Sequence, residues 1–216
     1  MDRCVALLAL AAVVLAGGPV QAQSTDLSLS NVTAAYRALD GLQASFVQVT
    51  GSEFAGDSMR VEGSVVLSGN KYRVQTPTQT VVSDGATTWI YTPADSQVVV
   101  NDTDTGTSTI TPETFLTASS DRYEVEDATP TRRLGAPHLI LDATATAPDA
   151  RFQSVLLWVR RADRLVTRMQ ATDRSGSTID LRLRDLAVNP DTLRSGTPFT
   201  FAPPEHVRVI DLRSGD

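Results

Sequence analysis

Residues 80–100 read TVVSDGATTWIYTPADSQVVV. The stretch consists of three short runs of β-branched and aromatic residues, which is the composition of β-strands. Asp84-Gly85 between the first two runs is a strong signal for a tight hairpin, and Pro93-Ala94-Asp95 marks the second turn. The stretch therefore predicts antiparallel strands at Thr80–Asp84, Thr87–Thr92 and Gln97–Val100.

The same pattern continues on both sides of this stretch. The apolar phase changes after Leu183, which predicts a β-bulge near Asp185. Residues 27–41 instead repeat apolar side chains at helical spacing, with Ser28 or Ser30 as the N-cap and Gly41 as the left-handed C-terminal residue. Further strands are expected at Leu42–Thr50, Ser58–Ser68, Lys71–Thr76, Tyr123–Glu126, His138–Asp142, Phe152–Arg160, Leu165–Ala171 and Thr178–Val188.

These elements predict a mainly β fold with some α-helix, built as one strongly bent sheet or open barrel of about ten or eleven antiparallel strands. Several strands, such as residues 152–159 and 98–100, are apolar on both faces. Periodicity alone favours an ordinary sandwich core. The alternative is a curved sheet that holds an apolar guest under a helical lid, and the pattern leaves both open.

Composition narrows the classes of function. The chain has 216 residues, 41% of them hydrophobic, and a net charge of −6, which argues against nucleic-acid binding. Residues 1–22 have the basic start, short apolar run and small-residue end of a signal peptide. Cleavage after Ala22 would leave residues 23–216 as a single domain in the periplasm. It would also remove Cys4, the one cysteine of the chain.

No catalytic or cofactor motif is present in the sequence. With no second cysteine and no paired histidines, we expect no metal site and no cofactor. The acidic run at residues 101–106 lacks the glutamate of a calcium loop, because Pro112 stands in its place. We expect no enzyme, although a hydrolase that uses two carboxylates stays open as an alternative.

Several blocks then occur in a characteristic order. They are LQASFVQ at 42–48, GSVVL at 63–67, VSDG at 82–85, WIYTP at 89–93 and FTFAPP at 199–204. Together these blocks resemble the periplasmic outer-membrane lipoprotein carrier family, LolA, over essentially the whole chain after the signal peptide. The family pattern also has an Arg-Pro pair between the strands that contain Gly63 and Tyr72. The resemblance implies that this arginine holds the lid shut in the empty carrier. Here that turn is Ser68-Gly69-Asn70-Lys71, so the latch must be different or absent.

The resemblance implies an unclosed β-barrel whose concave apolar face is covered by helices. It also implies a carrier that takes the acyl chains of lipoproteins from an inner-membrane ABC-type releasing complex and delivers them to an outer-membrane acceptor. Such a carrier would act as a monomer and would need no covalent step. A periplasmic module of related fold that senses lipid or lipoprotein stays open as an alternative.

The resemblance and the strand pattern together select the residues that would line the acyl chamber. Phe115 and Leu116, on a short helix that begins at Thr111-Pro112, are the expected lid, and Val32, Tyr36 and Leu39 could cover the other end of the mouth. Each of these residues could equally be plain core, because a slip of one residue in register changes the face. The expected lining from the sheet is Phe46, Val65, Leu67, Tyr72, Val74, Trp89 and Tyr91.

Overall fold

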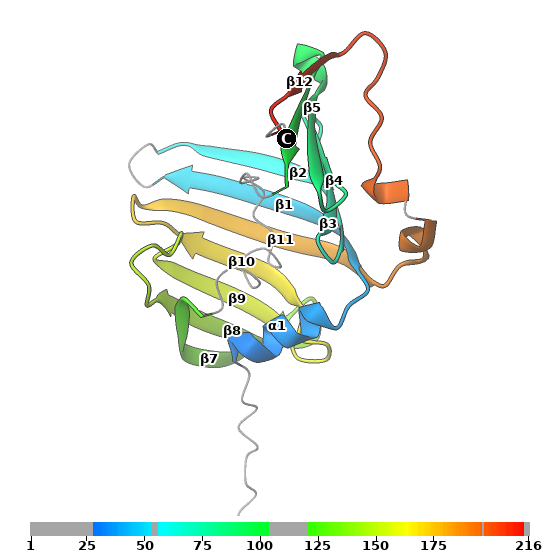
Figure 1. Ribbon diagram of the computed structural model, residues 1–216. Coiled ribbons are helices and arrows are strands. Elements are labelled where there is room, and N and C mark those ends of the chain that lie inside the picture. The colour runs from blue at the N-terminus through cyan, green and yellow to red at the C-terminus, as the bar shows by residue number, and fades with distance from the viewer. Residues whose placement is uncertain (1–27, 53–55, 104–120, 196, 214–216) are drawn as a thin grey trace, which may run out of the picture.

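The computed structural model describes residues 28–52, 56–103, 121–195 and 197–213, and these residues form one helix and one sheet (Figure 1). Short 3₁₀ turns lie at Pro93–Asp95, Asp191–Ser195 and Thr197–Phe199. The regular elements are α1 Leu29–Arg37, β1 Leu42–Ser52, β2 Ser58–Ser68, β3 Lys71–Gln75, β4 Thr80–Ser83, β5 Thr87–Thr92, β6 Gln97–Asp102, β7 Tyr123–Arg133, β8 Ala136–Ala145, β9 Ser154–Arg160, β10 Val166–Thr172, β11 Ser177–Val188 and β12 Arg208–Asp211.

The sheet has twelve strands in the order β12-β6-β5-β4-β3-β2-β1-β11-β10-β9-β8-β7. β12 and β7 form its two edges, so the barrel is unclosed, as the sequence predicts. All neighbours are antiparallel except β12, which lies parallel to β6 and supplies the strand beyond the expected ten or eleven. In Figure 1 the half with β3–β6 and β12 stands up from the half with β7–β11, and the long β1–β11 pair joins the two.

The predicted bulge is confirmed. Gln43 pairs with Ala187 and Ser45 pairs with Arg184, so two residues of β11 lie opposite one residue of β1. Asp185, one of those two, has a left-handed φ of 52°. The bulge increases the local bend where the two halves of the sheet meet.

Helix α1 is shorter than predicted. Ser28 is its N-cap and accepts a hydrogen bond from the Asn31 N–H, but the helix ends at Arg37 with Ala38 as the right-handed C-cap. The assignment of Gly41 as a left-handed cap is therefore wrong. Val32 and Tyr36 are buried against the sheet, and the Val166 N–H donates to the Tyr36 hydroxyl at 3.2 Å. No helix within the described residues is long and apolar enough to cross a membrane.

We call the face that carries α1 the inner face. Register places Phe46 opposite Leu183, and Leu181 opposite Met169, so these side chains share that face with Leu157 and Leu141. Met169, Leu157 and Leu141 are completely buried. They form one hydrophobic cluster with the buried residues of α1, which holds the helix on the sheet.

Gly63 makes room for an aromatic ring in this cluster. It pairs directly with Phe46 across β1 and β2. A Cβ at Gly63 would lie 2.8 Å from the Phe46 Cζ and 2.3 Å from the carbonyl oxygen of Gln75. The ring of Phe46 thus lies over a position that only glycine can occupy without displacing its neighbours.

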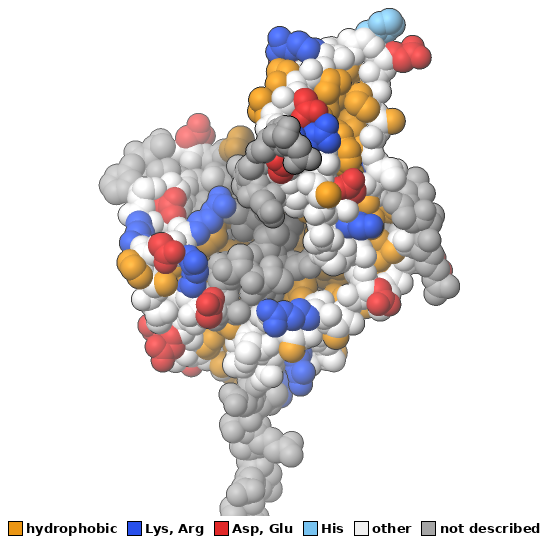
Figure 2. Space-filling view, in the orientation of Figure 1, with side chains coloured by type: hydrophobic (Ala, Val, Ile, Leu, Met, Phe, Trp, Pro, Cys, Tyr) orange, Lys and Arg blue, Asp and Glu red, His pale blue; other side chains and the backbone are white. Residues whose placement is uncertain are grey.

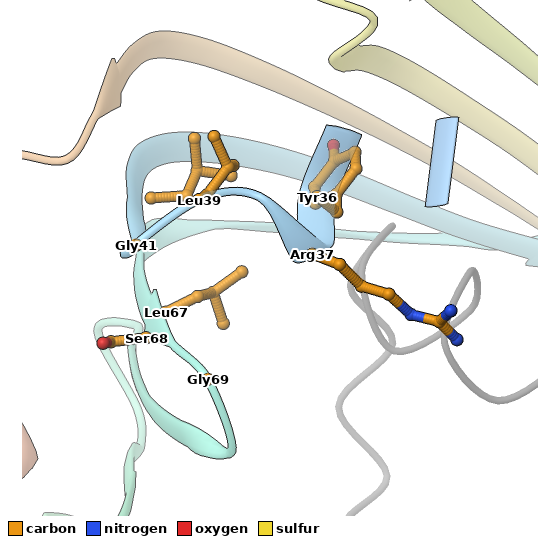
Figure 3. Close-up of a pocket in the computed structure, with 8 residues that line it drawn as sticks. Tyr36, Arg37, Leu39, Gly41, Leu67, Ser68 and Gly69 are labelled. Atoms are coloured by element: carbon orange, nitrogen blue, oxygen red, sulfur yellow. The ribbon is translucent and has the colours of Figure 1, made fainter. Parts of the chain in front are cut away.

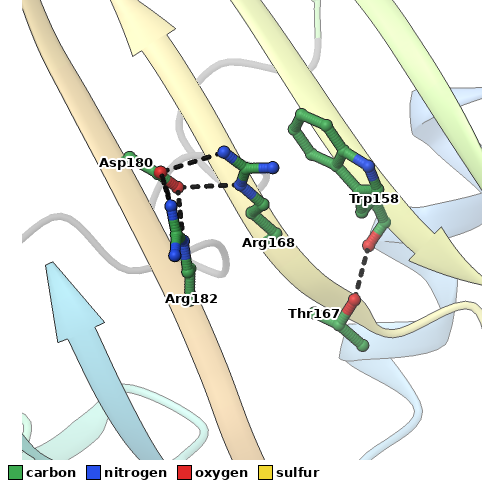
Figure 4. Close-up of polar contacts among 5 residues, drawn as sticks. All are labelled: Trp158, Thr167, Arg168, Asp180 and Arg182. Atoms are coloured by element: carbon green, nitrogen blue, oxygen red, sulfur yellow. Dashed lines mark hydrogen bonds and ion pairs between the residues drawn. The ribbon is translucent and has the colours of Figure 1, made fainter. Parts of the chain in front are cut away.

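The opposite, outer face of β9–β11 carries polar side chains that are bound to one another (Figure 4). Arg168 donates from Nε and Nη2 to the two carboxylate oxygens of Asp180, both at 2.9 Å. Arg182 donates to the same carboxylate at 2.6 Å. Burial disfavours the charged carboxylate, but the hydrogen bonds from these two arginines outweigh burial, so the pKa of Asp180 lies below its ordinary value.

Gly63→Ala should destabilise the fold by about 1–3 kcal/mol, because the added methyl group must displace the Phe46 ring or the β3 backbone. Denaturant unfolding measures the change. Gly51→Ala in the same β-ladder is the matched control, since its new Cβ would meet nothing closer than 3.4 Å. If both variants unfold alike, the proposed close packing at Gly63 is wrong.

Asp180 should contribute to stability at neutral pH and lose its contribution in acid. A carboxyl with a depressed folded pKa stabilises the fold above its unfolded pKa of about 3.9, and this contribution disappears as the pH falls through the lower folded pKa. Urea unfolding of wild type and Asp180→Asn should therefore differ most near neutral pH, and the difference should disappear in acid below both the unfolded and the folded pKa. A difference that is constant with pH would contradict this assignment.

Candidate functional site

A pocket of about 260 Å³ lies where α1 meets the turn between β2 and β3 (Figure 3). Tyr36 and Leu39 approach it from the helix side, and Leu67 rises from the end of β2. Among the described residues, the lining consists of Tyr36, Arg37, Leu39, Gly41, Leu42, Leu67, Ser68 and Gly69.

The walls of the pocket are apolar and its rim is polar. Leu42 and Leu67 are buried and pair directly across β1 and β2, so their side chains lie next to each other on the inner face. Arg37 is exposed, and in Figure 3 its side chain extends away from Leu39 and Leu67. An apolar space with a cationic rim suits a hydrophobic ligand better than a polar substrate.

Neutral hydrogen bonds hold the link between α1 and β1 that forms one side of this pocket. Ser68 donates from Oγ to the Asp40 carbonyl oxygen at 2.7 Å. The Asn189 side-chain oxygen accepts from the N–H groups of Asp40 and Gly41 at 2.9 and 3.1 Å. The Asn189 N–H donates in turn to the Gly41 carbonyl oxygen. We call Asp40-Gly41 with Ser68 and Asn189 the junction.

Gly41 is required at the junction by close contact and not by its backbone angle. A Cβ there would lie 2.4 Å from the Leu67 carbonyl oxygen and 2.3 Å from Leu193 Cδ1. Leu193, in the chain beyond β11, and the end of β2 thus both occupy the space that a side chain at Gly41 would need. Any larger residue would move β2 away from α1 and change the pocket.

Five of the predicted lining residues share the inner face. The pairs Leu67–Tyr72 and Val65–Val74 lie opposite each other across β2 and β3, in register with Phe46 on β1. Leu67 lines the pocket, whereas Phe46, Val65 and Val74 are buried in the hydrophobic cluster. Tyr72 is half-buried against the same cluster.

Trp89 and Tyr91 do not share that face, so their placement in the chamber is wrong. Register places Val74, Val81 and Ile90 in one row on the inner face. The neighbouring row, Arg73, Val82 and Trp89, therefore lies on the outer face. Tyr91 is two residues further along β5 on the same side. Its ring contacts Phe201 at a centroid distance of 6.0 Å.

The C-terminal segment Thr197–Phe201 covers this outer face. Arg73 donates to the Pro198 carbonyl oxygen at 3.4 Å, and Phe199 is buried. Val82, Val98 and Val100 are buried on the same face by register. Tyr91 thus helps to hold the C-terminal segment on this face, and Trp89 lies on the same face of β5. The predicted lid residues Phe115 and Leu116 lie outside the described residues.

On the inner face, the upper half of the sheet has less cover. Figure 2 shows hydrophobic side chains gathered in the upper part of the molecule, around the position of β5 and β12 in Figure 1. Register places Ile90, Val99 and Ile210 on this face, and each is only half-buried. An apolar surface therefore continues upward from the cluster beneath α1.

The sequence identified Tyr36 and Leu39 as covers of the mouth, and both line the pocket. It missed Arg37, Leu42, Ser68 and Gly69, because pocket residues at a junction of three elements share no periodicity. Within the described ranges, no three His, Cys, Asp or Glu side chains are grouped so that they could hold a metal ion.

The family described as outer membrane lipoprotein carrier protein LolA matches residues 37–201 of the chain. The chain belongs to this family. A similar curated protein is the outer-membrane lipoprotein carrier protein of Chromohalobacter salexigens, with 33% identity over 132 residues. This match covers 61% of the present chain and 60% of that protein's length.

Two solved structures match the chain over most of its length. An uncharacterized conserved protein from Thermus thermophilus matches with a TM-score of 0.55 at 13% identity, over 84% of this chain and 98% of that one. A LolA superfamily protein, NE2245 from Nitrosomonas europaea, matches with a TM-score of 0.42 at 15% identity, over 81% and 98% of the two chains. At such identities the likeness to the Thermus protein concerns the fold alone.

Asn189→Gly should loosen the junction without straining it, because glycine keeps the left-handed φ of 48° but removes the side-chain acceptor. Hydrogen exchange at the Asp40 and Gly41 amides should accelerate about tenfold, since a lost hydrogen bond costs about 1–1.5 kcal/mol. The amides of Ala86 and Thr87, which Asp84 accepts from, serve as the internal control. Unchanged exchange at Asp40 and Gly41 would show that Asn189 does not hold the junction.

Proposed function

We propose that this member of the LolA family is a periplasmic carrier that binds the acyl chains of lipoproteins in the pocket between α1 and the inner face. The observation that carries the proposal is an apolar pocket of about 260 Å³ beneath the one helix of the described residues, in a chain of this family. Apolar walls and a non-catalytic lining suit the transport of a lipid and require no covalent step.

The free energy of hydration explains why such cargo needs a carrier. Each buried methylene is worth about 0.8 kcal/mol, so an acyl chain of about fifteen carbons would cost on the order of 12 kcal/mol to leave in water. Shielding even part of the chain therefore changes its distribution between membrane and water by orders of magnitude. The net charge of −6 gives the outside of the carrier a polar, self-repelling surface.

The volume of the pocket sets how much of a chain it holds. A cavity of about 150 Å³ accommodates the six carbons of benzene, so 260 Å³ corresponds to about ten carbons. A longer chain requires α1 to move away from the sheet, or it must extend over the half-buried apolar surface at Ile90 and Val99. Movement of α1 would break the hydrogen bond between Val166 and Tyr36.

Several finer assignments belong to this proposal. Residues 1–22 are the signal peptide and residues 23–216 the carrier domain. Phe115 and Leu116 contact the acyl chain as part of the lid, while Leu67 and its inner-face neighbours contact it from the sheet. Cargo comes from an inner-membrane ABC-type releasing complex and passes to an outer-membrane acceptor, and the protein acts as a monomer without cofactor or catalysis.

Leu39→Trp should weaken the binding of a fluorescent acyl probe about tenfold. The larger side chain fills part of the pocket, and excluding two methylenes costs about 1.6 kcal/mol. Leu39 is only partly buried, so the fold should tolerate the change. Titration by probe fluorescence measures the affinity.

Val209→Trp is the control, because it adds the same ring on the half-exposed edge strand β12, away from the pocket. Equal affinity of both variants for the probe would place acyl binding elsewhere on the molecule.

Release of a lipoprotein from inner-membrane vesicles separates the carrier from the two alternatives. A carrier moves intact lipoprotein into solution as a complex, a sensing module binds acyl probe but leaves the lipoprotein in the vesicles, and a hydrolase changes the mass of the lipoprotein. Co-purification of intact lipoprotein with the protein is the expected result. Either of the other outcomes contradicts the proposed function.

A further inference from the structure

The outer face of β9–β11 carries arginines that the transport of lipid does not explain. Trp158 on β9 lies directly opposite Arg168 on β10, which lies directly opposite Arg182 on β11. The three side chains therefore form a row across the sheet, on the side away from the pocket (Figure 4). Arg184 continues this side of β11.

The row is preorganised by its own contacts. The Arg168 guanidinium lies 4.4 Å from the centre of the Trp158 ring, which is a cation–π stack. Its bidentate bond to Asp180 fixes the same group, and only 20% of the Arg168 side chain is exposed. Arg182, bound to the other side of Asp180, keeps 40% of its side chain exposed. Little side-chain entropy remains to be lost when a ligand binds there.

Positive charge exceeds negative charge in this region. Arg133 lies close enough for the charges of Arg168, Arg182 and Arg184 to add to the effect of burial in lowering its pKa. Its Nε is buried and has no hydrogen-bond partner within the described residues. We call Arg133, Arg168, Arg182, Arg184, Asp180 and Trp158 the arginine face.

Other carboxylates on the same side of the sheet do not neutralise this group. Glu62, across β1 from Arg182, is bound by Arg60. Asp142 on β8 lies in the same row as Asp180 but three strands away from it, with Gln170 and Leu156 between them. Of the four arginines, Arg168 and Arg182 are bound to Asp180, so the four guanidinium groups and this one carboxylate leave a local surplus of three positive charges in a chain whose net charge is −6.

We propose that the arginine face is a docking surface for an acidic, carboxylate-rich segment of a partner protein. Charge complementarity selects the sign of the partner, and Arg groups held in fixed planes match the geometry of carboxylates. Trp and Arg are also the residues that most often dominate binding energy in protein interfaces. The surface lies on the opposite side of the sheet from the pocket, so a carrier could hold cargo and partner at the same time.

Labelled poly-L-glutamate is the probe, with fluorescence anisotropy as the measurement. Arg184→Glu changes an exposed arginine and should weaken binding about tenfold at low salt, whereas Arg184→Lys should retain most of it. Arg174→Glu, on the exposed turn between β10 and β11, is the matched control with the same change of charge and should alter affinity less than about threefold. Equal losses in the two Glu variants would overturn the proposal.

Trp158 gives a second readout in the same protein. The chain has two tryptophans, so in a Trp89→Phe background the fluorescence comes from Trp158 at the arginine face. Poly-L-glutamate should change its intensity, and an unchanged spectrum on saturation would contradict binding there. An anionic membrane surface is the other possible occupant, and phosphatidylglycerol vesicles test it. If Arg184→Glu abolishes binding to vesicles but not to poly-L-glutamate, the surface recognises a membrane and the proposal is wrong.

Discussion

Strands with apolar side chains on both faces need cover on both sides, and this constraint shapes the whole molecule. On the inner face, α1 and the β7–β11 half bury a common cluster around Val32, Leu141 and Met169. On the outer face of β3–β6, the segment Thr197–Phe201 provides the cover. On the outer face of β9–β10, Arg168 lies over Trp158. The pocket is left where α1 ends and the turn after β2 begins.

Local sequence chemistry predicted much of this fold. At Asp84-Gly85 the carboxylate accepts from the Ala86 and Thr87 N–H groups, and Gly85 takes the positive φ that the turn requires. The bulge at Asp185 could also be predicted locally, because the alternation of apolar and polar side chains along β11 changes phase there, and this alternation depends only on neighbouring residues. The open barrel followed from many short strands and from the family blocks.

What could not be predicted depends on contacts between distant segments. Trp89 belongs to the outer face because β4 and β5 pair it with Val82, and only the complete register across β2–β5 fixes that side. Gly41 looked like a helix cap, but its role is set by Leu67 and Leu193, which are remote in sequence. Pocket residues at the junction come from α1, β1 and the β2–β3 turn, so no single pattern marks them.

The junction gives this protein its own way of fixing α1 relative to the sheet. Ser68 stands in the turn where the family pattern has an Arg-Pro pair, and its hydroxyl binds the Asp40 carbonyl. Asn189 holds the next peptide from the end of β11. These bonds are neutral, so salt should affect the position of the helix little, in contrast to a latch built from an ion pair.

The most direct test of the account is to locate a bound acyl chain. Stearate with a nitroxide near its methyl end, added to methyl-labelled protein, broadens the NMR signals of methyl groups close to the spin label. The account predicts selective broadening at Leu39, Leu42 and Leu67, with Val82 and Val98 under the C-terminal segment unaffected. Broadening of Val82 and Val98 instead, or of no methyl group, would contradict acyl binding between α1 and the inner face.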